Sequence, residues 1–414
     1  MNEAGIINTK VDKLYVAESR KIYGTLVRIL GDMELAEESM HEAFSAALIS
    51  WQATSLPENP VAWLISTAKF KGIDHLRRQQ HLQQLMRIDV EQTEVDLPLH
   101  SDIDTINNDY LRLIFICCHP ALAPQIQVAL TLREVCGLTT EAIADAFFIS
   151  PASLAQRIVR GKAKIRQARI PFEVPNNNQL ADRIDSVLSV IYLVFNEGYT
   201  TSLNGTAAQV DLCQQAIHLA ESVLALYQDA EVMGLLAMML FHDARKHARR
   251  SKGGHIVLLQ HQDRQRWNRT LIARAQQLVS HAMAMGNYGI YTLQAAIARE
   301  HAVAEHFADT NWNRIESLYL LMQQLEPSPV TALNHAVAVS YAQSPLAALK
   351  LLDNLAADHT LCKLHLFHCA RADMLTRLSQ NKEALAVLQH AHSLAPTLAE
   401  KELISCRIKE LEKN

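Results

Sequence analysis

The sequence predicts an all-α protein with more than one domain. Glycine and proline are scarce, at 13 and 12 of 414 residues, and 49% of the residues are hydrophobic. Apolar residues recur every three or four positions along most of the chain, which is the spacing of one helix face. Seven cysteines without a CxxC pair do not suggest a disulfide framework, and no apolar run is long enough to span a membrane. We therefore expect a helical, cytoplasmic protein without a membrane segment.

The first predicted helix ends near Gly31, and the second begins with an acidic stretch. Its carboxylates, with no lysine or arginine among them, are Asp32, Glu34, Glu37, Glu38 and Glu42. Acids suit the start of a helix because its dipole is positive there. Further along, however, Glu38 and Glu42 repel each other at i,i+4 spacing. A partner with a basic surface would relieve that repulsion, and a solvated acidic face is the alternative.

A loop at residues 53–60 leads to a helix that carries both cations and aromatic rings. Its cations are Lys69, Lys71, Arg77 and Arg78. Trp63 and Phe70 are interleaved with them. This combination suits a nucleic acid with unstacked bases, because cations meet phosphates and rings offer stacking surfaces. The alternative for Trp63 is a place in the hydrophobic core.

Residues 81–109 change character. They are rich in aspartate and glutamate, contain Leu97-Pro98, and show only a weak apolar period. This composition predicts a linker with little core of its own. Helix is expected again from Tyr110, and a further helix over residues 124–136.

The stretch from Gly137 to Arg169 predicts two helices joined by a tight turn. Thr139 is the expected N-cap of the first helix, which runs from Thr140 to Phe148. Ser150 followed by Pro151 is a strong start signal for the second. Its apolar stripe comprises Leu154, Ile158, Gly161 and Ile165, and its opposite face is polar and cationic. This is the layout of a helix-turn-helix, which places its second helix in the DNA major groove. The alternative is a helix hairpin with a solvated basic face.

The order of these elements resembles the extracytoplasmic-function sigma factors, a bacterial group of the sigma-70 family. The resemblance covers residues 10–170 and includes a Trp-Leu pair that leads into a cationic segment ending Asp-x-Leu-Arg-Arg. It implies three parts: sigma region 2 in residues 1–80, an acidic linker in residues 81–109 along the RNA exit path, and sigma region 4 in residues 110–172. Many members carry asparagine where this chain has Phe70, so no base contact is transferred there.

The resemblance also implies partners, namely promoter DNA and core RNA polymerase through its β′ clamp helices and β flap. The residues expected to contact polymerase are Asp32, Glu37, Glu38 and Glu42. Those expected at the promoter −10 element are Lys69, Lys71, Arg77 and Arg78. At the −35 element, residues near the start of the recognition helix contact base edges and later ones contact phosphates. Ser153, Gln156 and Arg157 are the candidates for bases, and Arg160, Lys162 and Lys164 for phosphates.

Residues 176–414 leave the sigma pattern and form pairs of Ala-rich helices. They resemble tetratricopeptide repeats, and the whole architecture resembles the sigma-factor subgroup with a C-terminal tetratricopeptide-like extension. The resemblance implies a regulatory role or a protein partner for these repeats. The segments NEGYT (196–200) and QDRQRW (262–267) are unusually polar. They suggest a buried polar network, with a pocket as the alternative.

Two groups of residues raise the alternative of metal or enzyme chemistry in this half. His242-Asp243, with Arg245 nearby, is similar to the metal-binding pair of phosphohydrolases, and Cys362, His365 and Cys369 could share a helix face. Neither group has its further ligands at helical spacing. We therefore expect no metal, no cofactor and no catalytic residue.

Together these features predict a sigma factor that directs core polymerase to specific promoters and initiates transcription. The first alternative is a helix-turn-helix DNA-binding regulator with a repeat scaffold. A regulator of duplex DNA needs neither the acidic helix nor the basic-aromatic helix, so these two elements argue against it. The second alternative is a helical scaffold or hydrolase whose N-terminal half is incidental.

Overall fold

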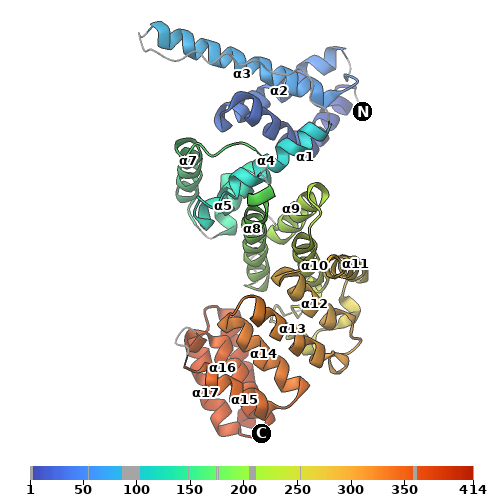
Figure 1. The fold of residues 1–414 in the computed structure, drawn as a ribbon, viewed down its shortest axis with the longest axis vertical. Coiled ribbons are helices and arrows are strands. Elements are labelled where there is room, and N and C mark those ends of the chain that lie inside the picture. The colour runs from blue at the N-terminus through green and yellow to red at the C-terminus, as the bar shows by residue number, and fades with distance from the viewer. Residues whose placement is uncertain are drawn as a thin grey trace. The chain divides into compact units, whose positions relative to one another are not determined.

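The structure, a computed structural model, describes residues 3–54, 56–85, 103–147, 149–173, 175, 177–204, 211–251, 253–357 and 361–413. These ranges are almost entirely helical, and their only β feature is an isolated bridge between Arg250 and Ile256 (Figure 1). The all-α prediction is therefore confirmed. The chain divides into two compact units, residues 1–191 and 192–414.

The first unit contains the elements predicted for the sigma-like half. They are α1 (Glu3–Leu30), α2 (Met33–Thr54), α3 (Pro60–Leu85), α4 (Ile103–Cys117), α5 (Pro124–Leu130), the π-helix η1 (Thr131–Val135), α6 (Thr140–Ala146), α7 (Pro151–Gln167) and the first part of α8 (Asn177–Asn204). The expected boundary at residues 172–176 precedes the division between the units, because the start of α8 packs with the first unit. Arg183 of α8 donates a 2.6 Å hydrogen bond to the carbonyl of Phe115.

Helices α1, α2 and α3 pack on one another around large buried side chains, among them Tyr23, Met40 and Trp51. Helix α4 packs against α1 at a point of close approach. A Cβ on Gly24 would lie 3.1 Å from the carbonyl oxygen of Asp109, so a residue without a side chain fits there. The acidic helix and the basic-aromatic helix are thus neighbours in one bundle.

The capping residues and the apolar stripe that predict the helix-turn-helix make the expected contacts in the structure. The Thr139 side chain accepts a hydrogen bond from the backbone N–H of Ala142, and Ser150 accepts one from Ser153. The whole predicted apolar stripe of α7 is buried: Leu154, Ile158, Gly161 and Ile165. Gly161 permits close contact with α5, since a Cβ there would lie 2.7 Å from a methyl group of Ile126. The helix α6 ends at Ala146, and the expected end at Phe148 lies outside the described residues.

Two element boundaries differ from the sequence prediction. Helix α4 begins at Ile103 rather than at Tyr110, and this earlier part contains the buried Ile106 and the buried Asp109, which pairs with Arg28. The single helix expected over residues 124–136 is instead α5 followed by the π-helix η1. Most of the expected acidic linker, residues 86–102, lies outside the described residues.

The described residues of the second unit continue α8 and form ten further α-helices. They are α9 (Leu212–Leu226), α10 (Ala230–Ala244), α11 (Arg269–Met285), α12 (Ile290–Val303), α13 (Trp312–Leu325), α14 (Pro329–Ala342), α15 (Pro345–Leu355), α16 (His365–Arg377), α17 (Asn381–Leu394) and α18 (Leu398–Lys413). Short 3₁₀ turns connect some of them: η2 (Lys246–Ala248), η3 (Leu259–His261), η4 (Arg264–Arg266), η5 (Phe307–Asp309) and η6 (Leu361–Lys363).

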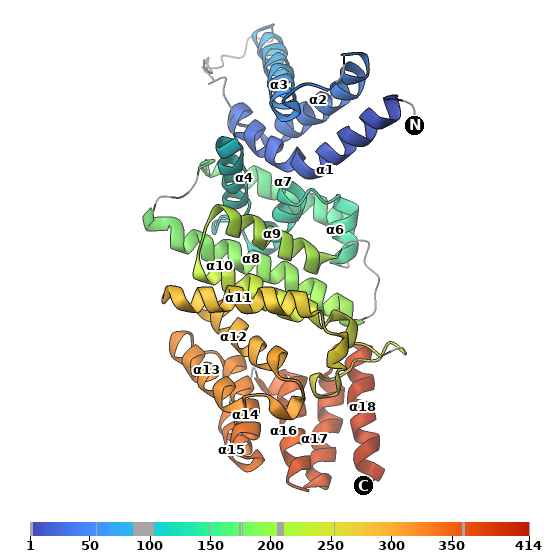
Figure 2. The same cartoon turned by 90° about the vertical axis from the view of Figure 1, so that its right-hand side faces the viewer.

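Consecutive helices of this unit pack on each other, as expected for a helical-repeat region. Helix α10 packs on α11 and α12, and α13 packs on α14. Figure 2 shows α16, α17 and α18 side by side, in agreement with their contacts. Small residues such as Ala336, Ala372 and Ala384 are completely buried, which allows the helix axes to approach closely. In the described part of the chain, no helix combines the length and apolarity needed to cross a bilayer.

Candidate nucleic-acid interface

The outer face of α7 presents most of the residues predicted for the −35 element. Ser153, Gln156, Arg160 and Lys164 are exposed, and Arg157 is half-buried. Among the described residues no carboxylate pairs with Arg157, Arg160 or Lys164. Because the stripe on the opposite side holds the helix to α5, these polar side chains share the free face. The helix therefore offers a cationic surface of the shape that enters a major groove.

Lys162 is placed differently from the other predicted −35 residues. Its side chain is only 10% exposed, and its Nζ lies 3.0 Å from Glu134 Oε1 and 3.9 Å from Glu37 Oε2. Position 162 lies beside the buried Gly161, so its side chain turns toward the protein body. In this arrangement Lys162 contacts carboxylates and is not accessible to a phosphate.

The residues predicted to contact polymerase on α2 have different surroundings. Glu38 is exposed. Glu37 accepts a 2.9 Å hydrogen bond from Arg133 of η1, so its carboxylate is already paired within the first unit. Asp32 caps α2, because its Oδ1 accepts bonds from the N–H groups of Glu34 and Leu35. The capping interaction is thus the local reason for an acid at this position.

Glu42 joins the acidic helix to the basic-aromatic helix. Its carboxylate lies 3.2 Å from Lys71 Nζ and 3.3 Å from His75 Nε2. Burial alone would raise the pKa of Glu42, but hydrogen bonds from His75 and Lys71 outweigh it, and the pKa lies below its ordinary value. Glu38, Glu42 and His75 bring three ligand atoms within 4.8 Å, a spacing that could hold a cation. The Lys71 ammonium, 3.2 Å from Glu42, already balances the charge of that carboxylate.

Helix α3 carries the other residues predicted for the −10 element. Arg77 and Arg78 are exposed, and Arg78 pairs with Asp74 at 2.7 Å. Phe70 is 72% exposed between Lys69 and Lys71, which leaves an aromatic ring accessible among cations. Trp63 is half-buried and packs edge-on against the buried Trp51, with ring centroids 5.2 Å apart. Trp63 is therefore partly a core residue, and Phe70 offers the accessible ring of this helix.

A buried polar network beneath these surfaces was not predicted. Glu134 is fully buried, and its Oε2 accepts a 2.7 Å hydrogen bond from Tyr23. Burial and the Glu134 carboxylate raise the pKa of Tyr23 well above its ordinary value, so the phenol keeps the proton it donates. Asp109 is also fully buried, and it pairs with Arg28 at 2.9 Å and with Arg112 at 2.6 Å. Asp109 is the last residue of the predicted acidic linker, but its i,i+3 spacing to Arg112 is typical of a helix.

The second unit contains the two polar segments noted in the sequence. Asn196 and Tyr199 come from the first segment and Trp267 from the second, and all three line one cavity of about 590 Å³. His242 accepts a 2.8 Å hydrogen bond from Arg245 at Nδ1, and Asp243 accepts one from Gln214. His242 and Asp243, the pair considered for metal binding, therefore both have hydrogen-bond partners within the chain. The alternative Cys362, His365 and Cys369 group does not share one helix, since Cys362 lies in η6.

Comparisons with known proteins cover both units. Residues 14–82 match the family description "Sigma-70 region 2", residues 112–165 match "Sigma-70, region 4", and residues 183–283 match "Family of unknown function (DUF6596)". An uncharacterized protein of Rhizobium meliloti (strain 1021) is 38% identical over 406 residues, which are 97% of this chain and 96% of that protein. Among solved structures, the crystal structure of yeast Tom70 has a TM-score of 0.36 and 11% identity, over 98% of this chain and 85% of the Tom70 chain.

The two sigma matches fall on the helices described above. The region 2 match spans most of α1 with all of α2 and nearly all of α3, and the region 4 match runs from α4 to α7. In sigma factors these regions join core RNA polymerase to promoter DNA. The first unit therefore contains sigma-70 regions 2 and 4, which support a sigma-factor role in transcription initiation, and over nearly its whole length the chain belongs to the family of the Rhizobium meliloti protein.

Proposed function

We propose that the protein is a cytoplasmic sigma factor of the extracytoplasmic-function group. It would direct core polymerase to specific promoters, without catalytic residues of its own. The C-terminal unit would be a tetratricopeptide-like extension for regulation or for a protein partner. The matches to sigma-70 regions 2 and 4 and the order of the helices support the proposal. The cationic side chains of α3 and α7, the two helices predicted to contact DNA, also support it.

The observation that carries the proposal is the free cationic face of α7. Ser153, Gln156 and Arg157 lie in its first two turns, where a recognition helix contacts base edges. Arg160 and Lys164 lie further along and would contact phosphates. Lys162 would join them only if its pair with Glu134 opened.

Region 2 would supply the remaining contacts. The exposed Glu38, with Asp32 and Glu42, would meet the basic β′ clamp helices, and Glu37 would do so after exchanging its pair with Arg133. Lys69, Lys71, Arg77 and Arg78 would contact the −10 phosphates. The exposed ring of Phe70 is suited to stack on a base of the opened strand.

The −35 assignment predicts different effects for two neighbouring arginines. A bidentate Arg–guanine contact discriminates by about 1–3 kcal/mol, so Arg157→Ala should weaken binding mainly to DNA with the correct −35 element. Arg160→Ala should weaken binding by a similar factor on all sequences, because phosphates carry no sequence information. The measurement is the affinity of the protein–polymerase complex for promoter DNA selected from a random library, with the −35 element intact or scrambled.

Scrambled DNA provides the control for sequence-independent attraction. Equal losses for Arg157→Ala on intact and scrambled elements would overturn its role in base recognition. If neither variant changed the affinity, α7 would not be the helix that contacts the −35 element.

A further inference from the structure

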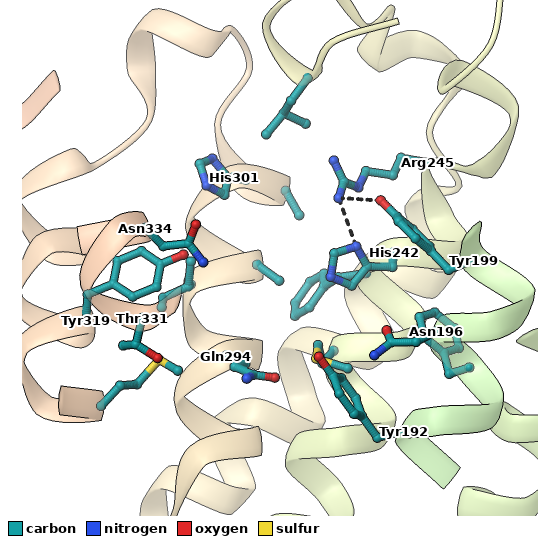
Figure 3. Close-up of a pocket in the computed structure, with 18 of the residues that line it drawn as sticks. Tyr192, Asn196, Tyr199, His242, Arg245, Gln294, His301, Tyr319, Thr331 and Asn334 are labelled. Carbon is teal, nitrogen blue, oxygen red and sulfur yellow. Dashed lines mark hydrogen bonds between the residues drawn. The ribbon is translucent and has the colours of Figure 1, made fainter. Parts of the chain in front are cut away.

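The second unit encloses a cavity that the sigma function does not use. It has a volume of about 590 Å³, within the range of small-molecule sites. Figure 3 shows Tyr192, Asn196 and Arg245 on one side, and Tyr319 and Asn334 on the opposite side. The walls come from α8, α10, α12, α13 and α14, so the cavity is built by helices far apart in the sequence.

Among the described residues, the cavity lining contains no carboxylate and one arginine, Arg245. Arg249 and Arg264 do not line the cavity but stack on the lining rings of Tyr199 and Trp267. The two lining histidines are neutral at neutral pH. Burial, followed by the nearby Arg245, lowers the pKa of His242 well below its ordinary value. Burial, with Arg245 and Arg264, lowers the pKa of His301 to about 4. A ligand that complements this lining carries a single negative charge, because one guanidinium balances one anionic group.

Arg245 is held in place by neutral partners. Its Nη2 donates to Tyr199 Oη at 3.3 Å and to His242 Nδ1 at 2.8 Å (Figure 3). No carboxylate among the described residues forms an ion pair with it. A guanidinium has five N–H donors, so Arg245 keeps donors that can bind a planar carboxylate.

Two further polar atoms of the lining have no hydrogen-bond partner among the described residues. They are Trp267 Nε1 and His301 Nδ1, and both are buried. The Trp267 residue is only 4% exposed. Because neither atom has appreciable accessible surface, neither of them faces the cavity space.

The rest of the lining combines aromatic rings with aliphatic side chains and with neutral polar ones, among them Gln294 and Asn334. Phe195, Phe241 and Trp267 contribute rings, and Tyr192 and Tyr319 contribute rings that end in a hydroxyl group. Aromatic rings favour offset or edge-to-face contacts with another ring, which adds to the free energy gained by burial. A flat ring therefore finds aromatic partners in these walls, and the neutral polar side chains can bond to polar groups on that ring.

We propose that this cavity binds a small aromatic monocarboxylate. The carboxylate pairs with Arg245, and the ring lies between the aromatic walls. The cavity is an effector site within the C-terminal unit, separate from the residues proposed to contact DNA.

The test is calorimetric titration of the full chain with benzoate, phenylacetate and indole-3-acetate, each paired with its uncharged amide. At least one acid should bind, and at least tenfold more tightly than its amide. Arg245→Gln should remove that preference, and Arg245→Lys should keep part of it because the charge remains. Ala298→Phe fills the cavity and should abolish binding of acid and amide alike. Arg274→Gln, at an exposed arginine on α11, is the control and should leave binding unchanged.

Several outcomes would overturn the proposal. The proposal fails if none of the three acids produces heat of binding, or if acid and amide bind equally. Unchanged affinity in a folded Arg245→Gln protein, with the wild-type melting temperature, would exclude the guanidinium as the anion partner. Equal binding of inorganic phosphate would indicate a site for a dianion.

Discussion

Glu134 is a fully buried carboxylate whose charge is balanced by one lysine. Lys162 Nζ lies 3.0 Å away, and Tyr23 adds a hydrogen bond of 2.7 Å. Removing one member of a buried ion pair leaves an uncompensated charge in a medium that solvates it poorly. Lys162 therefore stabilises the first unit in this arrangement, and its role at promoter DNA stays a prediction.

This residue-scale account predicts the outcome of a mutant cycle. Lys162→Met should lower the free energy of unfolding by about 3 kcal/mol, because Glu134 loses its counter-charge. Glu134→Gln in the same chain should recover most of the loss, since a neutral amide needs no cation. Urea unfolding of the single and double variants measures both effects. A Lys162→Met protein as stable as the wild type would show that the pair contributes little.

At the scale of elements, helix α12 is capped by a side chain of another helix. The Glu231 carboxylate of α10 accepts bonds from the backbone N–H groups of Gly289, Tyr291 and Thr292, at 2.8, 2.8 and 3.0 Å. A Cβ on Gly289 would lie 2.8 Å from that carboxylate, so the position admits glycine most easily. The cap ties the two helices together at the start of α12.

Removal of this cap should destabilise the second unit more than loss of a surface ion pair does. Glu231→Ala should cost about 2–3 kcal/mol, because three buried or partly buried donors lose their acceptor. Glu221→Ala is the matched control, since it breaks only exposed pairs, with Arg274 and His218, and should cost below about 1 kcal/mol. Denaturant unfolding monitored by circular dichroism compares the two. Equal losses would mean that the cap is replaced by water.

The buried histidines of α10 and α12 predict a pH dependence for the same unit. His301 has a pKa lowered to about 4, so the folded state excludes a proton that the unfolded chain binds near pH 6.5. Its contribution is complete above the unfolded pKa and is lost as the pH falls toward the folded pKa. Between pH 7 and 5.5 the loss should be about 1 kcal/mol. His301→Gln should reduce this slope, and His218→Gln, at an exposed position, should not. A wild-type slope in the His301→Gln protein would contradict the account.

Capping residues and apolar periodicity predict where helices begin and which face is buried. They do not predict contacts between residues that are far apart in the sequence. Ser150, Pro151 and the apolar stripe define α7 within one stretch of sequence, so its start, caps and free face could be inferred. The pairing of Lys162 with Glu134 depends on packing between elements, and so does the capping of α12 by Glu231. The polar segments around Asn196 and Trp267 were recognisable, but their convergence on one cavity depends on the tertiary fold.

At the scale of the whole molecule, the chain combines a sigma-70 unit with a helical unit that contains its own cavity. Within the first unit, Glu37 pairs with Arg133 and lies near Lys162, so residues proposed for polymerase and for DNA are in contact with each other. Binding to polymerase would replace these internal pairs with intermolecular ones. Regions 2 and 4 would thus exchange their internal partners for intermolecular ones during initiation.

The most direct test of the central claim is transcription by purified core polymerase on fragmented genomic DNA of the producing organism, with and without this protein. The account predicts discrete start sites that require the protein and share two spaced upstream elements. A chain that binds DNA but leaves the start sites of core polymerase unchanged would be a DNA-binding regulator, and that result would contradict its assignment as a sigma factor.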